Sequence, residues 1–140
     1  MKLNNTSQYA IKILIHIVND DTQKLFSAKK ISEKLSIPYK YMTRVMSQLV
    51  DAKLLLSIRG RDGGYKLAQN PSDVTILDIL NAVHESINVK TCILGNKPCD
   101  EKQKCALHDL WVTPKKSINN MFKNTTLEML SQNENNFCLS

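Results

Sequence analysis

At 140 residues, 42% of them apolar, the chain is long enough for one domain with its own core and too short for two large domains. No run of eighteen apolar residues and no N-terminal export signal is visible, so we expect a cytoplasmic protein and neither a membrane nor a secreted one. The net charge of +6 is uneven: residues 1–70 carry 12 Lys and Arg against 5 Asp and Glu, whereas residues 71–140 carry 7 against 8. The basic first half favours a polyanionic partner, with nucleic acid ahead of a membrane surface.

Residues 7–19 predict the first helix, because apolar side chains recur there at three- and four-residue spacing. Ser7 is a candidate N-cap, and His16 is expected at the surface. Ile11 and Ile15 add a second apolar stripe. We therefore expect this helix to be covered on two sides, by the core and by a second surface such as a partner subunit.

The next two predicted helices form a helix-turn-helix. Ser27 can cap a short helix, a tight turn follows at residues 36–37, and Pro38 suits the first turn of the next helix because it has no amide hydrogen to satisfy. That helix has a buried stripe of Met42, Val45, Met46 and Leu49. The candidate DNA-contacting residues of this unit are Lys29, Tyr39, Lys40, Thr43, Arg44 and Ser47. Any amphipathic helix pair has a polar outer face, so this pattern alone favours DNA binding and a solvated surface equally.

A β-hairpin is predicted directly after the helix-turn-helix. Residues 54–59 and 65–67 alternate as two short strands around a glycine-rich tip at residues 60–64. Glycines let the tip approach another surface closely, and Arg59 and Arg61 can reach a groove or phosphates. A helix-turn-helix followed by such a hairpin is a winged helix, which moves the balance towards DNA binding. The candidate DNA-contacting residues of the wing are Arg59, Arg61, Gly63 and Gly64.

Three of the four cysteines, Cys92, Cys99 and Cys105, lie in a polar stretch, with His108 about one helical turn beyond. Cysteines in such a setting have no role in core packing; they can form a disulfide, bind zinc, hold an iron–sulfur cluster or act as redox thiols. The gaps between them are wider than those of structural zinc sites, and stable disulfides are not expected in a reducing compartment. From the residues alone, a metal or cluster site and plain redox thiols both stay open.

Two further helices are predicted in the second half. Thr75 and Asp78 have the spacing of a capping box, which opens a helix that closes the core. Beyond the cysteines, apolar residues recur over residues 107–130 in a stripe that a monomer of this size could hardly bury. We interpret this segment as a dimerisation helix, kinked or split at Pro114, with a last turn capped by Thr126.

These segments predict a mainly α fold, a winged helix-turn-helix with a two-stranded wing and a long C-terminal dimerisation helix. The expected domains are a DNA-binding domain (residues 1–84), a cysteine-bearing sensor loop (85–106), the dimerisation helix (107–130) and a disordered tail (131–140). Cys138, in that tail, is interpreted as incidental. No paired general acid and base and no phosphate-binding loop is visible, so we do not expect an enzyme.

Several motifs together carry a resemblance to a known family. They lie at residues 1–3, 9–10, 41, 58–67, 74–79, 110–111 and 125–127, of which the wing motif and the terminal Thr-Thr-Leu are the most specific. The chain resembles, over residues 1 to 130, the Rrf2 family of bacterial winged-helix regulators, the IscR, NsrR and CymR type. The resemblance implies a homodimeric transcription factor, usually a repressor, that binds a partly palindromic DNA operator.

The resemblance also implies a cofactor. In cluster-binding members three loop cysteines hold a two-iron or four-iron cluster that responds to iron, redox state or nitric oxide, and Cys92, Cys99 and Cys105 fall on those positions. His108 falls where the histidine ligand of IscR-like members lies. NsrR-like members use a carboxylate of the other subunit, and the corresponding residue here is Gln8, a poor ligand, so His108 is the preferred fourth ligand. Other members lack a cluster and sense oxidants through cysteine, which makes a thiol sensor the alternative.

Overall fold

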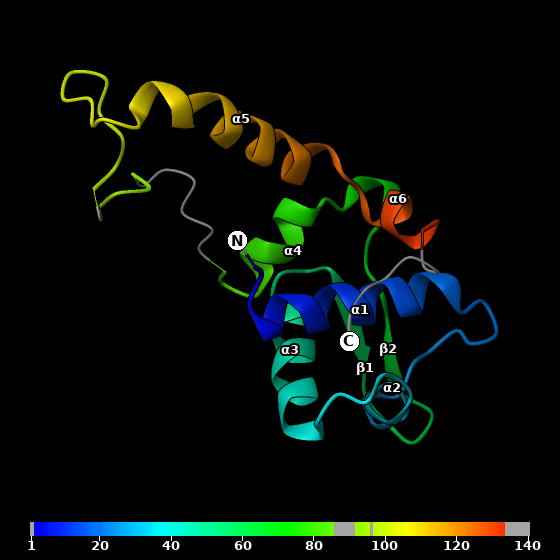
Figure 1. Cartoon of the computed structure of the whole chain (residues 1–140). Helices are drawn as coiled ribbons and strands as arrows, with labels where there is room; N and C mark the ends of the chain where they lie inside the picture. Colours follow the sequence, from blue (N-terminus) through cyan, green and yellow to red (C-terminus); the bar gives the residue numbers. More distant parts are fainter. Residues whose placement is uncertain (1, 86–91, 96, 134–140) are drawn as a thin grey trace.

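The computed structural model describes residues 2–85, 92–95 and 97–133. Its elements are α1 (Asn5–Asn19), α2 (Ala28–Leu35), α3 (Tyr39–Asp51), β1 (Leu55–Ile58), β2 (Gly64–Leu67), the 3-10 helix η1 (Pro71–Asp73), α4 (Ile76–Ala82), α5 (His108–Asn124) and α6 (Leu127–Ser131). α1 lies at the centre, with α3 and the β1–β2 hairpin on one side and α4 and α5 on the other (Figure 1). The fold is mainly α with a two-stranded wing and a long C-terminal helix, as the sequence predicts. Within the described ranges, no helix combines the length and apolar character needed to cross a membrane.

Helix α1 begins earlier than the sequence pattern predicts, with Asn4 as its N-cap. The Asn4 side chain accepts a hydrogen bond from the Ser7 backbone N–H at 2.8 Å. Ser7 is therefore not the N-cap; it is buried inside the helix, and its hydroxyl donates to the carboxylate of Glu85. The same carboxylate accepts from the Asn4 N–H at 3.0 Å. A negative charge thus lies at the positive end of the helix dipole.

The chain itself buries α1 on several sides. α2, α3, α4, α6 and β2 all contact it. Ile11 and Ile15 are buried in this single chain, so no partner subunit is needed to cover them. His16, expected at the surface, is only 8% exposed, and its ring meets that of Phe26 edge to face with the centroids 6.0 Å apart. The expected coverage of α1 on two sides is confirmed, and the covering elements belong to the same chain. The expectation for His16 is wrong because elements distant in the sequence pack on α1, which the periodicity of α1 alone cannot reveal.

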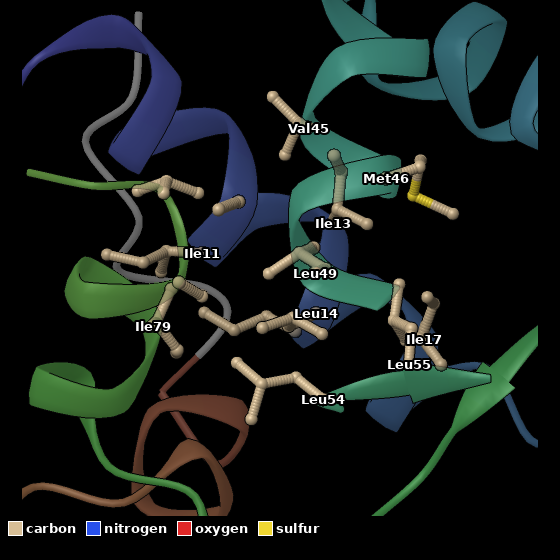
Figure 2. Packing of buried hydrophobic residues seen from close by; sticks show 14 of the residues in the cluster. Ile11, Ile13, Leu14, Ile17, Val45, Met46, Leu49, Leu54, Leu55 and Ile79 are labelled. Carbon is tan, nitrogen blue, oxygen red and sulfur yellow. The ribbon is translucent and has the colours of Figure 1, made fainter. Parts of the chain in front are cut away.

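Helices α2 and α3 form the predicted helix-turn-helix. Ser36 ends α2 in the left-handed conformation, with φ of 54°, and the Ser32 hydroxyl donates to the Ile37 carbonyl at 2.6 Å. Pro38 is the N-cap of α3 and not a residue of its first turn. The predicted buried stripe is confirmed, and Figure 2 shows three of its members in the core beside α1: Val45, Met46 and Leu49. Each such buried side chain contributes about 1.5–3 kcal/mol.

The wing is an antiparallel pair of short strands. Leu55 lies opposite Leu67, and Ile58 lies opposite Gly64. Leu55 is fully buried, whereas Leu56 and Ile58 are exposed. The hairpin therefore rests on the core through the base of β1 and extends its far end into solvent.

A backbone bridge ties the wing to the segment before α2. Phe26 and Tyr65 exchange two hydrogen bonds, of 2.8 and 2.9 Å. The chains come so close that a Cβ on Gly64 would lie 2.8 Å from the Phe26 carbonyl oxygen, and one on Gly63 would lie 2.1 Å from the Ile58 carbonyl oxygen. Both glycines are therefore required by the close approach of backbone segments.

The starts of α4 and α6 lie side by side. The Ile76 N–H donates to the Thr125 carbonyl at 2.9 Å, and the Leu127 N–H donates to the Val74 carbonyl at 2.7 Å. The Thr126 side chain caps α6, as expected from the sequence. The Thr-Thr-Leu segment thereby returns the chain from α5 to the hydrophobic core around α1.

Two expectations about the C-terminal region are corrected. Of the two alternatives at Pro114, a kink or a split, the split is excluded because α5 continues through this residue, and the kink stays a prediction. The helix ends at Asn124, with Thr125 as its C-cap, and the Thr125 carbonyl accepts a hydrogen bond from the Ile76 N–H at the start of α4. Ser131 is the last residue of α6, so disorder does not begin at this position. Residues 134–140, with Cys138, lie outside the described residues.

Replacing Gly64 with Ala is expected to lower the free energy of unfolding by about 1–3 kcal/mol, because the added methyl group pushes against the Phe26 carbonyl. Urea unfolding followed by circular dichroism measures this change. Gly95→Ala is the matched control, since a Cβ at that position meets no atom within 4 Å. Equal stabilities of the two variants would contradict the close approach of the wing to Phe26.

Candidate DNA-binding surface and cysteine site

The outer face of α3 is exposed along the helix. The five candidate DNA-contacting residues of α3 are all exposed, namely Tyr39, Lys40, Thr43, Arg44 and Ser47. Tyr41 and Asp51 of the same helix are exposed as well, and Lys29 is exposed on α2. The Thr43 hydroxyl donates to the Lys40 carbonyl at 3.1 Å, and the Lys40 ammonium lies 5.0 Å from the centroid of the Tyr41 ring. These side chains are accessible to DNA on the side of α3 that faces away from the core. Their contact with DNA stays a prediction.

The wing adds two exposed cations to this part of the molecule. Arg59 and Arg61 are both exposed. Lys104 and Asp109 form an ion pair at 3.2 Å, whereas neither arginine is in a salt bridge with another described residue. Figure 1 shows the hairpin loop and α2 at one end of the molecule and α5 at the opposite end. The two glycines of the tip have the structural role described above, and their contact with DNA also stays a prediction.

The four metal ligands predicted from the sequence line one cavity. Its volume is about 1020 Å³, and its walls include Cys92, Cys99, Cys105 and His108. The three cysteines are half-buried, whereas His108 is only 5% exposed. His108 is the first residue of α5, and its N–H donates to the Cys105 carbonyl at 3.0 Å. The structure thus gathers these side chains where the cysteine stretch meets α5.

Cys92 and Cys105 are in contact within this cavity, with their sulfur atoms 3.4 Å apart. The pKa of the Cys92 thiol lies below its usual value because the backbone N–H of Leu94 hydrogen-bonds to the sulfur, with a smaller contribution from Cys105. Cys99 and Gly95 add still smaller contributions, and burial opposes them. The thiolate is the form that binds metals and reacts with oxidants, so this environment favours both chemistries.

The donor set fits iron. Thiolates are the usual ligands of iron–sulfur clusters, and histidine replaces cysteine in some of them. Across residues 2–85, 92–95 and 97–133, however, no three His, Cys, Asp or Glu side chains are close enough together to hold one metal ion. The four side chains therefore line the cavity but are not close enough together to coordinate one metal ion. The cysteine-bearing segment would have to change conformation to bring them around a cluster.

A second cavity, of about 700 Å³, lies between α4 and α5. Glu85, Cys99 and His108 line it, so Cys99 and His108 belong to the walls of both cavities. Glu85 also holds the N-terminus of α1 through its bonds to Asn4 and Ser7. Glu85 was not predicted from the sequence, because it follows the predicted core helix and belongs to no periodic pattern or motif.

Comparisons with known proteins agree with this architecture. The family pattern described as Rrf2, iron-dependent transcriptional regulator, matches residues 3–133. The HTH-type transcriptional regulator IscR of Vibrio parahaemolyticus is 30% identical over 135 residues, which cover 96% of this chain and 80% of that protein.

Solved structures show the same fold. CymR, the global cysteine regulator of B. subtilis, matches with a TM-score of 0.78 at 25% identity, over 94% of this chain and 97% of that one. IscR of T. potens matches with a TM-score of 0.74 at 22% identity, over 100% and 94% of the two chains. The sequence match over nearly the whole chain and the winged helix-turn-helix lead to one conclusion: the chain belongs to the Rrf2 family of DNA-binding transcriptional regulators and is not an enzyme.

Proposed function

We propose that this protein is a cytoplasmic, homodimeric repressor whose binding to a DNA operator is controlled by an iron–sulfur cluster that senses iron, redox state or nitric oxide. The observation that carries the proposal is the single cavity lined by Cys92, Cys99, Cys105 and His108. The iron-dependent description of the family and the IscR relative support the same cofactor. Bound there, a cluster of two or four irons supplies a centre that gains or loses electrons and reacts with nitric oxide.

His108 is the fourth ligand of this proposal. Its imidazole lies in the cavity wall, and its backbone is fixed by the bond to the Cys105 carbonyl. Gln8, the alternative position near the N-terminus, uses its amide nitrogen to donate to the Leu3 carbonyl at 2.6 Å. A neutral amide is a poor ligand for iron, whereas an imidazole is a good one.

Glu85 connects the cysteine site to the DNA-binding domain. It lies on the wall of the cavity shared with Cys99 and His108, and its carboxylate bonds to Asn4 and Ser7 at the start of α1. α1 in turn packs on α3. A rearrangement of the ligands would therefore act on α1 and, through it, on the recognition helix.

In a dimer, such a movement would change the spacing of the two recognition helices. Half-sites in DNA lie about 34 Å apart, so a small rotation of one domain can switch binding. Tyr39, Lys40, Thr43, Arg44 and Ser47 would read the major groove, and Arg59 with Arg61 would reach the minor groove or the backbone. Lys29 on α2 would contact phosphate.

A cluster-free thiol sensor on the same scaffold is the second candidate. The contact between the sulfur atoms of Cys92 and Cys105 favours it, because thiols so close together can pair on oxidation. The two candidates differ in iron content, which the following experiment measures.

Protein purified without oxygen is expected to be brown, with two or four irons and equal sulfide per chain, because three thiolates and one imidazole are available as ligands. Absorption spectroscopy with iron and acid-labile sulfide analysis measures this. Cys99→Ala is expected to abolish the visible bands, whereas Cys138→Ala, which changes none of the four proposed ligands, is expected to keep them. A colourless wild-type protein after attempted cluster reconstitution would leave the thiol sensor as the function.

Replacing Arg61 with Ala is expected to weaken operator binding and to reduce the slope of log affinity against log salt by about one, because one phosphate contact is lost. The duplex is selected from a randomised library with wild-type protein, and fluorescence anisotropy at several salt concentrations gives the slope. Lys123→Ala, exposed on α5, is the control that should leave it unchanged. If both variants match the wild type, the wing does not contact DNA.

The dimer is expected to depend on the outer face of α5. Leu110 is 74% exposed and Met121 is 49% exposed. They are eleven positions apart, which is about three helical turns, so both lie on the same side of α5. Leu110→Glu should shift the mass in multi-angle light scattering from twice 15.9 kDa towards 15.9 kDa. Asn120→Glu adds the same charge at an exposed polar position of α5 and should remain dimeric. A dimeric Leu110→Glu variant would place the interface elsewhere.

A further inference from the structure

Cys92 and Cys105 are positioned for a reaction of their own. Their sulfur atoms lie 3.4 Å apart although the residues are 13 positions apart in the sequence. A disulfide bond is about 2.05 Å long, so an approach of roughly 1.4 Å would join them. Both side chains are half-buried and therefore remain partly accessible to a small oxidant.

The backbone around each cysteine holds this pair in place. The Cys92 N–H donates to the Lys97 carbonyl at 2.8 Å, and its carbonyl accepts from Gly95 at 3.1 Å, which closes a turn. The Cys105 carbonyl accepts from the His108 N–H at the start of α5. Each sulfur is thus carried by a segment with its own hydrogen bonds.

Cys99 has a different position. It lies on the walls of both cavities, and its neighbours in the second one include Glu85 from the end of the DNA-binding domain. No sulfur contact of the length found between Cys92 and Cys105 involves Cys99 among the described residues. The geometry therefore brings Cys92 and Cys105 into direct contact and places Cys99 beside them, near enough to Cys92 for a side-chain hydrogen bond and on the walls of both cavities.

We propose that Cys92 and Cys105 form a reversible disulfide when the cluster-free chain meets a hydroperoxide, and that this bond blocks cluster assembly until a dithiol reductant opens it. The disulfide itself is independent of DNA binding. The block on assembly rests on the proposed function, because it assumes that the two cysteines are cluster ligands.

The reaction balances as a two-electron oxidation. The thiolate of one cysteine attacks an oxygen of the hydroperoxide, so that a sulfur–oxygen bond forms, the oxygen–oxygen bond breaks and water or an alcohol leaves. The thiolate of the other cysteine then attacks this sulfenic acid, forming the sulfur–sulfur bond and releasing the oxygen as water. Two thiols are oxidised, and one peroxide is reduced. A dithiol reductant reverses the change by thiol–disulfide exchange.

The test uses hydrogen peroxide and the full metal-free chain carrying Cys138→Ser, which leaves three thiols. One equivalent of peroxide is expected to lower the titratable thiols from three to one, and an added Cys99→Ser substitution should lower them from two to none. Adding Cys92→Ser or Cys105→Ser instead should prevent the disulfide, so the remaining member of the pair stops at the sulfenic acid, which dimedone traps, and Cys99 keeps its thiol. Mass spectrometry of unreduced proteolytic fragments identifies the linked residues.

Linkage of Cys99 to either neighbour, or thiols that persist in the Cys99→Ser variant, would overturn the assigned pair. For the block on assembly, peroxide-treated protein given iron and sulfide should show less than one tenth of the visible absorbance of reduced protein and recover it after dithiothreitol. Full absorbance without the reductant would overturn the block. If the reduced protein also fails to assemble a cluster, the proposed function fails and with it the block, while the thiol counts still decide the disulfide.

Discussion

The burial of α1 is the constraint on which the rest of the structure depends. Ala10, Ile13 and Leu14 are completely buried, and the helix contacts α2, α3, α4, α6 and β2. The ends of α1 are held by distant residues as well. Glu85 bonds to its first turn, and the Asn19 amide nitrogen donates to the Ser131 carbonyl at 3.1 Å. A side chain added to or removed from α1 is therefore felt by the recognition helix, the wing and the C-terminal helices together.

This central position gives a physical basis for coupling. The N-terminus of α1 is bonded to the last described residue before the cysteine stretch, and the side of α1 packs on α3. The net charge also differs between the two halves of the chain, because the basic residues predominate in the first half. The half that carries the proposed DNA-contacting residues and the half that carries the cysteines can thus have different chemistry while sharing one packed helix.

Local patterns made much of the fold predictable. The stripe of α3, the hairpin and the capping box of Thr75 and Asp78 depend on residues close together in the sequence, and all three are present. The burial of His16 and the bond between Ser7 and Glu85 depend on segments far apart, so periodicity could not reveal them. The rule that proline disrupts a helix left both a kink and a split open at Pro114, so the continuation of α5 through this residue could not be predicted from the sequence.

The cysteine site was predictable in composition but not in arrangement. Its cysteines lie in one stretch, so the sequence could group Cys92, Cys99 and Cys105 with His108 without knowing how the chain turns. It could not reveal that two sulfur atoms touch while Cys99 lies between two cavities. Thiolate character promotes both metal binding and oxidation, so the same sulfur atoms are open to two competing fates. Under the proposed function, iron supply and the balance of oxidant and reductant would decide which of the two reactions occurs, and this competition would let the cysteine stretch act as a sensor.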